Sequence, residues 1–303
     1  MRFGILTGGG DCPGLNAVLR SAVRSGGVVH GHEFVGYRDG WHGVLEGETR
    51  PLAPDAVGGI LHRGGTILGT SGVNPYGIAG GPELARATFE RDRLDGMIVV
   101  GGEGTLGAAA QLAADGLPIV GVPKTIDNDL AMADYTVGFH TAVQVATDAI
   151  LIPERPFDLE EVCARLRRRH VLGASFSIVV VAEGALPAEG TMRVPDYPLD
   201  ANGWPRLGGI SNLIAPELQR LTGYETRVII LGHVQRGGSP VAFDRILGTR
   251  LGIAAVNVAT AGGWGRMATL YRGDVVDVPL ADAVAERRVV PDSLIRAAKV
   301  FFG

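Results

Sequence analysis

Short apolar runs alternate with helical patterns along the first half of the chain. The runs at 3–6, 97–100 and 117–122 have the length of buried strands. Apolar residues at helical spacing follow the first two runs, over 15–23 and 108–113. Strands that alternate with helices are typical of a parallel sheet covered by helices. The pattern therefore predicts an α/β protein.

The second half of the chain has a less regular pattern. Helical spacing recurs over 139–150 and 251–259, and a late strand is expected at 272–279. The stretch 187–206 contains several prolines and has little periodicity, so we expect a surface loop or hairpin there.

Composition limits the possible classes of protein. With 303 residues, 46% of them apolar, the chain can form one or two domains. A net charge of -4 gives no general positive field, so we expect no nucleic-acid partner. Cys12 and Cys163 are the two cysteines, which favours a reducing cytoplasm over a disulfide framework. We expect no signal peptide and no membrane span, because no apolar run approaches about 18 residues.

Glycines cluster where the apolar runs end. The segment 7–14, which holds four glycines, joins the first strand to its helix and matches neither the P-loop nor the dinucleotide pattern. Glycines allow a polyphosphate to approach the backbone, and a helix start attracts the anion, so we favour a phosphate site over a simple turn.

The glycines of 101–107 do match the dinucleotide pattern GxGxxG, at Gly102, Gly104 and Gly107. We expect this segment to be a loop between strand and helix. Glu103 lies inside it, and a carboxylate repels a pyrophosphate unless a cation lies between them. A nicotinamide-dependent oxidoreductase therefore stays open as an alternative that only this pattern supports.

The densest polar cluster is Pro-Lys-Thr-Ile-Asp-Asn-Asp at 123–129, directly after a predicted strand. In open α/β sheets ligands bind at the carboxyl ends of strands. Asp127 and Asp129 can have different roles, because one carboxylate can take a proton while the other holds a cation or orients a hydroxyl. Thr125 can donate to a phosphate oxygen. Asn and Asp also favour turns, so a structural turn is the competing interpretation.

Four motifs together are similar to the signatures of the 6-phosphofructokinase family and follow that family's order. They are Thr-Gly-Gly-Gly-Asp-Cys-Pro-Gly-Leu-Asn at 7–16, Gly-Gly-Glu-Gly-Thr at 101–105, the 123–129 cluster, and Leu-Gly-His-Val-Gln-Arg-Gly-Gly-Ser-Pro at 231–240. The combination most resembles the actinobacterial branch, whose members use ATP or pyrophosphate.

The resemblance implies two interleaved domains, each a mainly parallel sheet flanked by helices. Residues 1–137 and 238–285 would bind the phosphoryl donor, and residues 138–237 and 286–303 would bind the sugar phosphate. The implied activity is ATP-dependent phosphorylation of fructose 6-phosphate at its 1-hydroxyl with Mg2+. A homotetramer with shared active sites is also implied, with Arg227 reaching a neighbouring subunit.

The resemblance also assigns site residues. Asp127 would be the base, with Asp129 beside it and Thr125 touching the transferred phosphoryl group. Glu103 would help to hold Mg2+. The nucleotide phosphates would lie along Gly9, Gly102, Gly104, Thr105 and Lys124. Fructose 6-phosphate would be held by Glu183, Arg227, His233 and Arg236.

Two positions bear on the phosphoryl donor. In this family, a glycine at Gly104 leaves room for the ATP α-phosphate, whereas pyrophosphate users usually carry an aspartate there. Lys124 is usual in pyrophosphate users. ATP-dependent members of the actinobacterial branch combine both residues, so we expect ATP and keep a pyrophosphate-dependent enzyme as the alternative.

The chain departs from the family pattern at two places. Gly72 stands where the family normally has an arginine that bridges the transferring phosphates. The predicted helix 139–150 runs straight into Leu151, whereas family members have a strand, a Met-Gly-Arg motif and a helix between these pieces. A catalytically impaired paralogue that binds nucleotide or sugar phosphate is therefore a further alternative.

Overall fold

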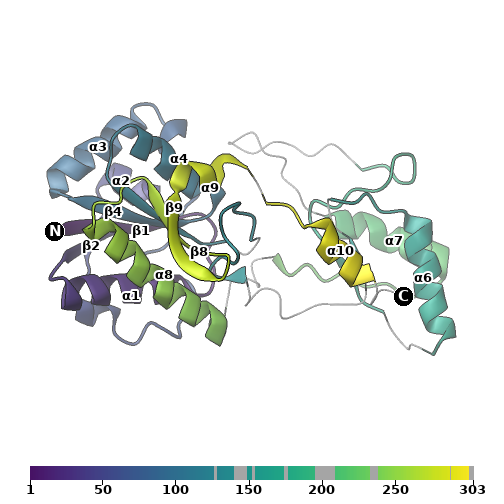
Figure 1. Ribbon diagram of the computed structural model, residues 1–303. Helices are drawn as coiled ribbons and strands as arrows, with labels where there is room; N and C mark the ends of the chain where they lie inside the picture. The colour runs from purple at the N-terminus through teal and green to yellow at the C-terminus, as the bar shows by residue number, and fades with distance from the viewer. Residues whose placement is uncertain are drawn as a thin grey trace. The chain divides into compact units, whose positions relative to one another are not determined.

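The computed structural model describes residues 1–125, 128–139, 149–151, 154–173, 177–194, 209–232, 238–286 and 288–299. The chain divides into two compact units (Figure 1). The first unit consists of Met1–Gln144 and Gly232–Arg288, and the second of Val145–Leu231 and Val289–Gly303. Both units are therefore built from two separate stretches of the chain.

A seven-stranded sheet forms the centre of the first unit, in the order β3-β2-β1-β4-β5-β8-β9. Its strands are β1 (Arg2–Thr7), β2 (Glu33–Tyr37), β3 (Thr49–Pro51), β4 (Gly96–Gly101), β5 (Ile119–Pro123), β8 (Arg266–Tyr271) and β9 (Asp274–Pro279). The inner strands run parallel, and the edge strands β3 and β9 pair antiparallel with their neighbours. The strand order reverses between β1 and β4, where open α/β sheets form a ligand-binding crevice.

Helices cover both faces of this sheet (Figure 1). They are α1 (Leu15–Arg24), α2 (Trp41–Glu46), α3 (Gly81–Asp92), α4 (Glu103–Ala114), α8 (Ala242–Thr260) and α9 (Leu280–Ala285). In β4, Ile98 and Val100 point into the apolar cluster that contains α1 and α8. The alternate residues Met97 and Val99 point into the cluster that contains α3 and α4. The continuous apolar runs of the sequence thus correspond to strands buried on both faces.

Close packing of α1 against α8 depends on glycine. A Cβ atom at Gly252 would lie 2.0 Å from Ser21 Oγ and 2.6 Å from the Val18 carbonyl oxygen. Gly252→Ala is therefore expected to lower the free energy of unfolding by about 1–3 kcal/mol, because the two helices must move apart. Urea unfolding followed by circular dichroism measures this change.

The matched control is Gly107→Ala in α4, where a Cβ atom meets no other atom within 4 Å. This variant should gain about 0.5–1 kcal/mol, because alanine favours the helix more than glycine does. Equal effects of the two substitutions would contradict the packing explanation.

The second unit contains less regular structure. Strands β6 (Ala149–Leu151) and β7 (Val179–Val181) form a two-stranded parallel sheet. The helices described in this unit are α6 (Leu159–Val171), α7 (Ile210–Thr222) and α10 (Asp292–Lys299). A small apolar cluster, which includes Phe157, Cys163 and Ile214, joins α6 to α7. Burial raises the pKa of the Cys163 thiol, which keeps it protonated and unreactive.

Most predicted strands and helices are confirmed, with two corrections. The segment 101–107 is not a loop, because α4 already begins at Glu103 and only Gly102 separates it from β4. Residues 149 and 150, predicted at the end of a helix, belong to strand β6. Residues 195–206 of the predicted loop lie outside the described residues. None of the described helices has the length and apolar character needed to cross a membrane.

Candidate functional site

Three connections meet at the carboxyl ends of β1, β4 and β5. A Cβ atom placed on Gly9 would lie 3.5 Å from Lys124 Nζ and 3.5 Å from Thr105 Oγ1. A Cβ atom on Gly102 would lie 3.3 Å from the Lys124 carbonyl oxygen and 3.7 Å from Thr125 Cβ. The structure therefore brings together five of the predicted site residues from three separate motifs.

The connection after β1 is a tight glycine turn. Gly9 has a φ of 77°, which favours glycine. Its N–H donates to the Ser71 carbonyl oxygen at 2.9 Å, and the Gly8 N–H donates to the Val100 carbonyl oxygen at 2.9 Å. The turn is thus fixed both to β4 and to the loop that contains Gly72.

The amino terminus of α4 points its first N–H groups toward this crevice. Gly102 caps the helix without a side-chain hydrogen bond, and Glu103, Gly104 and Thr105 form the first turn. Free N–H groups and the helix dipole favour a phosphate at this position. Gly104 is exposed, and a Cβ atom there meets no other atom within 4 Å outside its own helix backbone. Thr105 is buried, and its carbonyl oxygen accepts a hydrogen bond from Trp41 Nε1 at 3.2 Å.

Lys124 is the buried cation of the site. The residue is 3% exposed, and its Nζ donates to the Gly10 carbonyl oxygen of the glycine turn. The ammonium group is therefore held against the connection after β1, and its positive charge favours an anion at this place.

The rest of the 123–129 cluster is braced by local hydrogen bonds. Asn128 has a φ of 53°. Its side chain donates to the Asp134 carbonyl oxygen at 3.1 Å and accepts from the Thr136 N–H at 2.8 Å. Thr136 Oγ1 also donates to the Thr125 carbonyl oxygen at 2.6 Å. Asn128 therefore joins the backbone beside Asp129 to residues 134–136.

Of the two predicted catalytic aspartates, Asp129 is among the described residues. Asp129 is half-buried, and its carbonyl oxygen accepts from the Arg288 N–H at 2.9 Å. Asp127 lies outside the described residues, so its role as the base stays a prediction.

The predicted sugar-phosphate residues belong to the second unit or lie outside the described residues. Glu183 follows β7 and is exposed. Arg227 is also exposed and forms an ion pair with Glu225 at 2.8 Å. His233 and Arg236 are not among the described residues, so binding of the sugar phosphate by these side chains stays a prediction.

Sequence reasoning missed the residues that position the loop of Gly72. Asn16 donates to the carbonyl oxygens of Arg63 and Gly64 at 3.2 and 3.3 Å and accepts from the Ile67 N–H at 2.9 Å. Thr7 Oγ1 lies 2.9 Å from Thr66 Oγ1. Both Asn16 and Thr7 occur in the first motif, but only the fold brings residues 63–67 to them.

The described side chains fit Mg2+ bound together with a phosphate. No group of three or more His, Cys, Asp or Glu side chains that could hold a metal occurs within the described ranges. Mg2+ bound with phosphates needs only one or two carboxylates, since water and phosphate oxygens complete its coordination. Glu103 supplies a half-buried carboxylate at the start of α4.

Comparison with known proteins agrees with this geometry. The phosphofructokinase family model matches residues 2–151 and 146–259. The chain belongs to the phosphofructokinase family. A pyrophosphate–fructose 6-phosphate 1-phosphotransferase of Amycolatopsis methanolica is 46% identical over all of both chains. An ATP-dependent 6-phosphofructokinase of Streptomyces coelicolor is 47% identical over 97% of both chains.

A solved structure supports the fold of this phosphofructokinase. The Pichia pastoris phosphofructokinase in the T-state superposes with a TM-score of 0.79 at 25% identity. The match covers 99% of the present chain and 36% of the Pichia chain.

The same comparisons locate a segment that the relatives have and this phosphofructokinase lacks. The alignment with the Amycolatopsis enzyme extends over 342 positions, whereas the chain has 303 residues. The family match is split into two parts that meet at residues 146–151. The additional positions of the relatives therefore fall near residues 146–151.

Proposed function

We propose that the chain catalyses transfer of the ATP γ-phosphoryl group to the 1-hydroxyl of fructose 6-phosphate with Mg2+. Family membership and relatives named 6-phosphofructokinase support the phosphotransferase reaction, which belongs to glycolysis. Relatives of similar identity are named for ATP and for pyrophosphate, so the donor is argued from the residues of the site.

The open space at Gly104 carries the choice of ATP. Gly104 lies in the first turn of α4 and has no side chain. A Cβ atom placed on it would meet no atom within 4 Å outside its own helix backbone. A nucleotide that extends beyond its β-phosphate needs such room, whereas pyrophosphate does not. An aspartate here would fill the space and place a negative charge against the α-phosphate.

Lys124 is compatible with either donor. Its ammonium group is buried and donates to the Gly10 carbonyl oxygen. A lysine that holds the glycine turn in place is suited to ATP as well as to pyrophosphate. The presence of Lys124 therefore does not favour pyrophosphate as the donor.

In the proposed reaction the protein positions the reactants and neutralises charge. Gly9, Gly102, Thr105 and Lys124 would line the donor phosphates, and Glu103 would hold Mg2+, which neutralises phosphate charge when bound. Asp127 would take the proton from the sugar 1-hydroxyl. The sugar oxygen could then attack the γ-phosphorus of ATP as the bond to ADP breaks. Thr125 would donate to the phosphoryl group, and Asp129 would orient the acceptor.

Glu183 and Arg227 of the second unit, together with His233 and Arg236, would bind the sugar phosphate. By the family resemblance, Arg227 would serve a neighbouring subunit in a homotetramer. A cytoplasmic location would match the glycolytic substrates.

A turnover assay tests the proposal. Purified chain is supplied with fructose 6-phosphate and Mg2+, and with ATP or pyrophosphate separately, and fructose 1,6-bisphosphate is quantified. We expect product with ATP. Product with pyrophosphate but not with ATP would contradict the choice of ATP and support the pyrophosphate-dependent reaction.

A catalytically impaired paralogue is the second candidate, because Gly72 replaces an expected arginine and a segment is missing near residues 146–151. Folded protein that binds ATP without turnover would favour it. The intact 123–129 motif opposes it.

Gly72→Arg is expected to raise kcat. Gly72 is exposed in the loop fixed to Gly9, and a Cβ atom there meets nothing within 4 Å, so the new side chain can be accommodated. Arginines that neutralise transferring phosphates contribute about 10³-fold or more in rate, and we expect at least about tenfold here.

The matched control is Gly77→Arg, which adds the same charge at another exposed glycine with open space around its Cβ position. Steady-state kinetics of both variants separates the two effects. A gain in both, or in neither, would contradict a specific role at position 72.

A further inference from the structure

Asp244 is a buried carboxylate that the proposed reaction does not use. It lies in the first turn of α8 and is 0% exposed. An acidic residue in the first turn favours the helix dipole, but a carboxylate withdrawn from water costs free energy unless hydrogen-bond donors face it. Its Oδ1 accepts a hydrogen bond from the Gly138 N–H at 3.1 Å. The burial of Asp244 therefore indicates a specific contact with another part of the chain.

Gly138 lies at the end of the connection that contains the predicted catalytic residues. Val137, directly before it, lies beside Lys124 in a parallel β-bridge. Thr136 Oγ1 donates to the Thr125 carbonyl oxygen at 2.6 Å. The two ends of the connection thus lie side by side. Because they are joined in this way, a contact that fixes Gly138 also limits the movement of Lys124 and Thr125.

The glycine segment 7–14 meets this connection at the same place. A Cβ atom on Gly14 would lie 2.6 Å from Val137 Cγ1 and 3.5 Å from Asp244 Cβ. Gly14 and Gly138 have φ angles of 106° and 102°, which other residue types rarely adopt. Asp244 therefore lies where two of the motifs that form the donor site come into contact.

We propose that Asp244 is a positioning residue for phosphoryl transfer, which holds Lys124 and Thr125 at the donor site through its hydrogen bond with Gly138. The inference rests on the proposed function. Asp244 would touch neither the donor nor the sugar, because it is fully buried. A reaction that depends on positioning is sensitive to such a contact, since a displacement of about 1 Å can cost on the order of 100-fold in rate.

Substitutions at Asp244 separate the hydrogen bond from the rest of the side chain. Asp244→Ala removes the acceptor of the Gly138 N–H, whereas Asp244→Asn keeps an oxygen that can accept it. We expect kcat with ATP to fall about 10–100-fold in Asp244→Ala, with KM for ATP changed less than about threefold because Gly9 and Gly102 would still line the donor phosphates. Asp244→Asn should recover most of the lost kcat.

Steady-state kinetics with ATP and fructose 6-phosphate measures these changes, and circular dichroism checks that each variant is folded. Asp244→Ser, which also shortens the side chain but keeps it polar, replaces Asp244→Ala if the alanine variant does not fold. Parental kcat in the shortened variant, or equal losses in that variant and in Asp244→Asn, would overturn the proposal.

The matched kinetic control is Asp95→Ala. Asp95 Oδ2 also accepts a backbone N–H, that of Arg2 at 2.6 Å. Arg2 begins β1, so this contact lies at the end of the sheet opposite the donor site. The control should therefore retain the parental kcat. An equal loss of kcat in Asp95→Ala and Asp244→Ala would assign the effect to general destabilisation and overturn the proposal.

Hydrogen exchange tests the anchoring contact without substrate. In Asp244→Ala the amides of 136–138 should exchange on the order of tenfold faster than in the parent, because their local structure opens more often. Unchanged exchange at these amides would overturn the proposal. Absence of turnover in the parent would instead contradict the proposed function, so the two failures are distinguishable.

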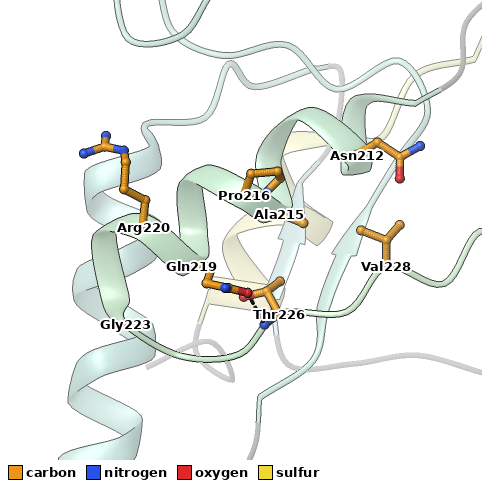
Figure 2. Close-up of a pocket in the computed structure, with 8 residues that line it drawn as sticks. All are labelled: Asn212, Ala215, Pro216, Gln219, Arg220, Gly223, Thr226 and Val228. Atoms are coloured by element: carbon orange, nitrogen blue, oxygen red, sulfur yellow. Dashed lines mark hydrogen bonds between the residues drawn. The ribbon is translucent and has the colours of Figure 1, made fainter.

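Gln219→Ala is the control for the exchange measurement. Gln219 Oε1 accepts the Thr226 N–H at 3.1 Å in the second unit (Figure 2). The pocket beside this contact is lined by none of the predicted site residues. The substitution should speed exchange of the Thr226 amide and leave the amides of 136–138 unchanged. Faster exchange at 136–138 in Gln219→Ala would contradict a specific effect of Asp244.

Discussion

Asp127→Asn is expected to reduce kcat for phosphoryl transfer by about 10²–10⁴-fold, the usual contribution of a general base. Asparagine keeps the shape of the side chain but cannot accept the proton from the sugar hydroxyl. The KM for ATP should change little, since the proposed donor contacts come from Gly9, Gly102 and Lys124. The predicted effect is thus confined to the chemical step.

Steady-state kinetics with ATP and fructose 6-phosphate measures this loss. The matched control is Asp134→Asn, a carboxylate of the same connection whose Oδ2 accepts from the Gly273 N–H at 2.7 Å. An asparagine oxygen can still accept that bond, so the control should retain the parental kcat. Equal kcat values for Asp127→Asn and the parent would remove Asp127 from the role of base.

The meeting of three motifs at one edge of the sheet could be predicted because it depends on local patterns. Apolar runs of strand length ended in glycine or in polar clusters, and parallel strands bring their carboxyl ends to one edge of a sheet. Gly9, Thr105 and Lys124 accordingly meet, although they come from three motifs far apart in the sequence. The family resemblance assigned roles that the residue types alone left open.

The errors arose where tertiary packing outweighs local preference. Glycines at 104 and 107 indicated a loop, but α4 includes them because Leu106 and Leu112 of the same helix are buried in the core. The loop of residues 63–72 had no periodic signal. Its position depends on long-range hydrogen bonds from Asn16 and Thr7, which a sequence pattern does not contain.

The exposed segment 228–231 of the second unit shows the same difference between local pattern and tertiary environment. Residues 228–231 have the apolar sequence of a buried strand, yet Ile229 and Ile230 are 82% and 62% exposed. A local pattern therefore predicts what a segment requires, and exposure in the structure reveals that the requirement is unmet. The seven-stranded sheet at whose strand ends Gly9, Thr105 and Lys124 meet belongs to the first unit.

Gly104→Asp is expected to lower kcat/KM for ATP on the order of 100-fold. An aspartate in the first turn of α4 would face the α-phosphate, and a like charge placed against a ligand costs several kcal/mol. The fold should be retained, because the position is open and an acidic residue in the first turn favours the helix dipole. Loss of ATP use with an unchanged unfolding transition would therefore report on the donor site itself.

The matched control is Gly107→Asp, which places the same charge one turn further along α4, also with no atom within 4 Å of the Cβ position. Its distance from the helix start should leave ATP turnover near the parental value. Both variants are assayed with ATP and with pyrophosphate, and their unfolding is compared by circular dichroism. If Gly104→Asp keeps full ATP turnover, the open space at this residue does not hold the nucleotide. The choice of ATP over pyrophosphate would then lose the observation that carries it.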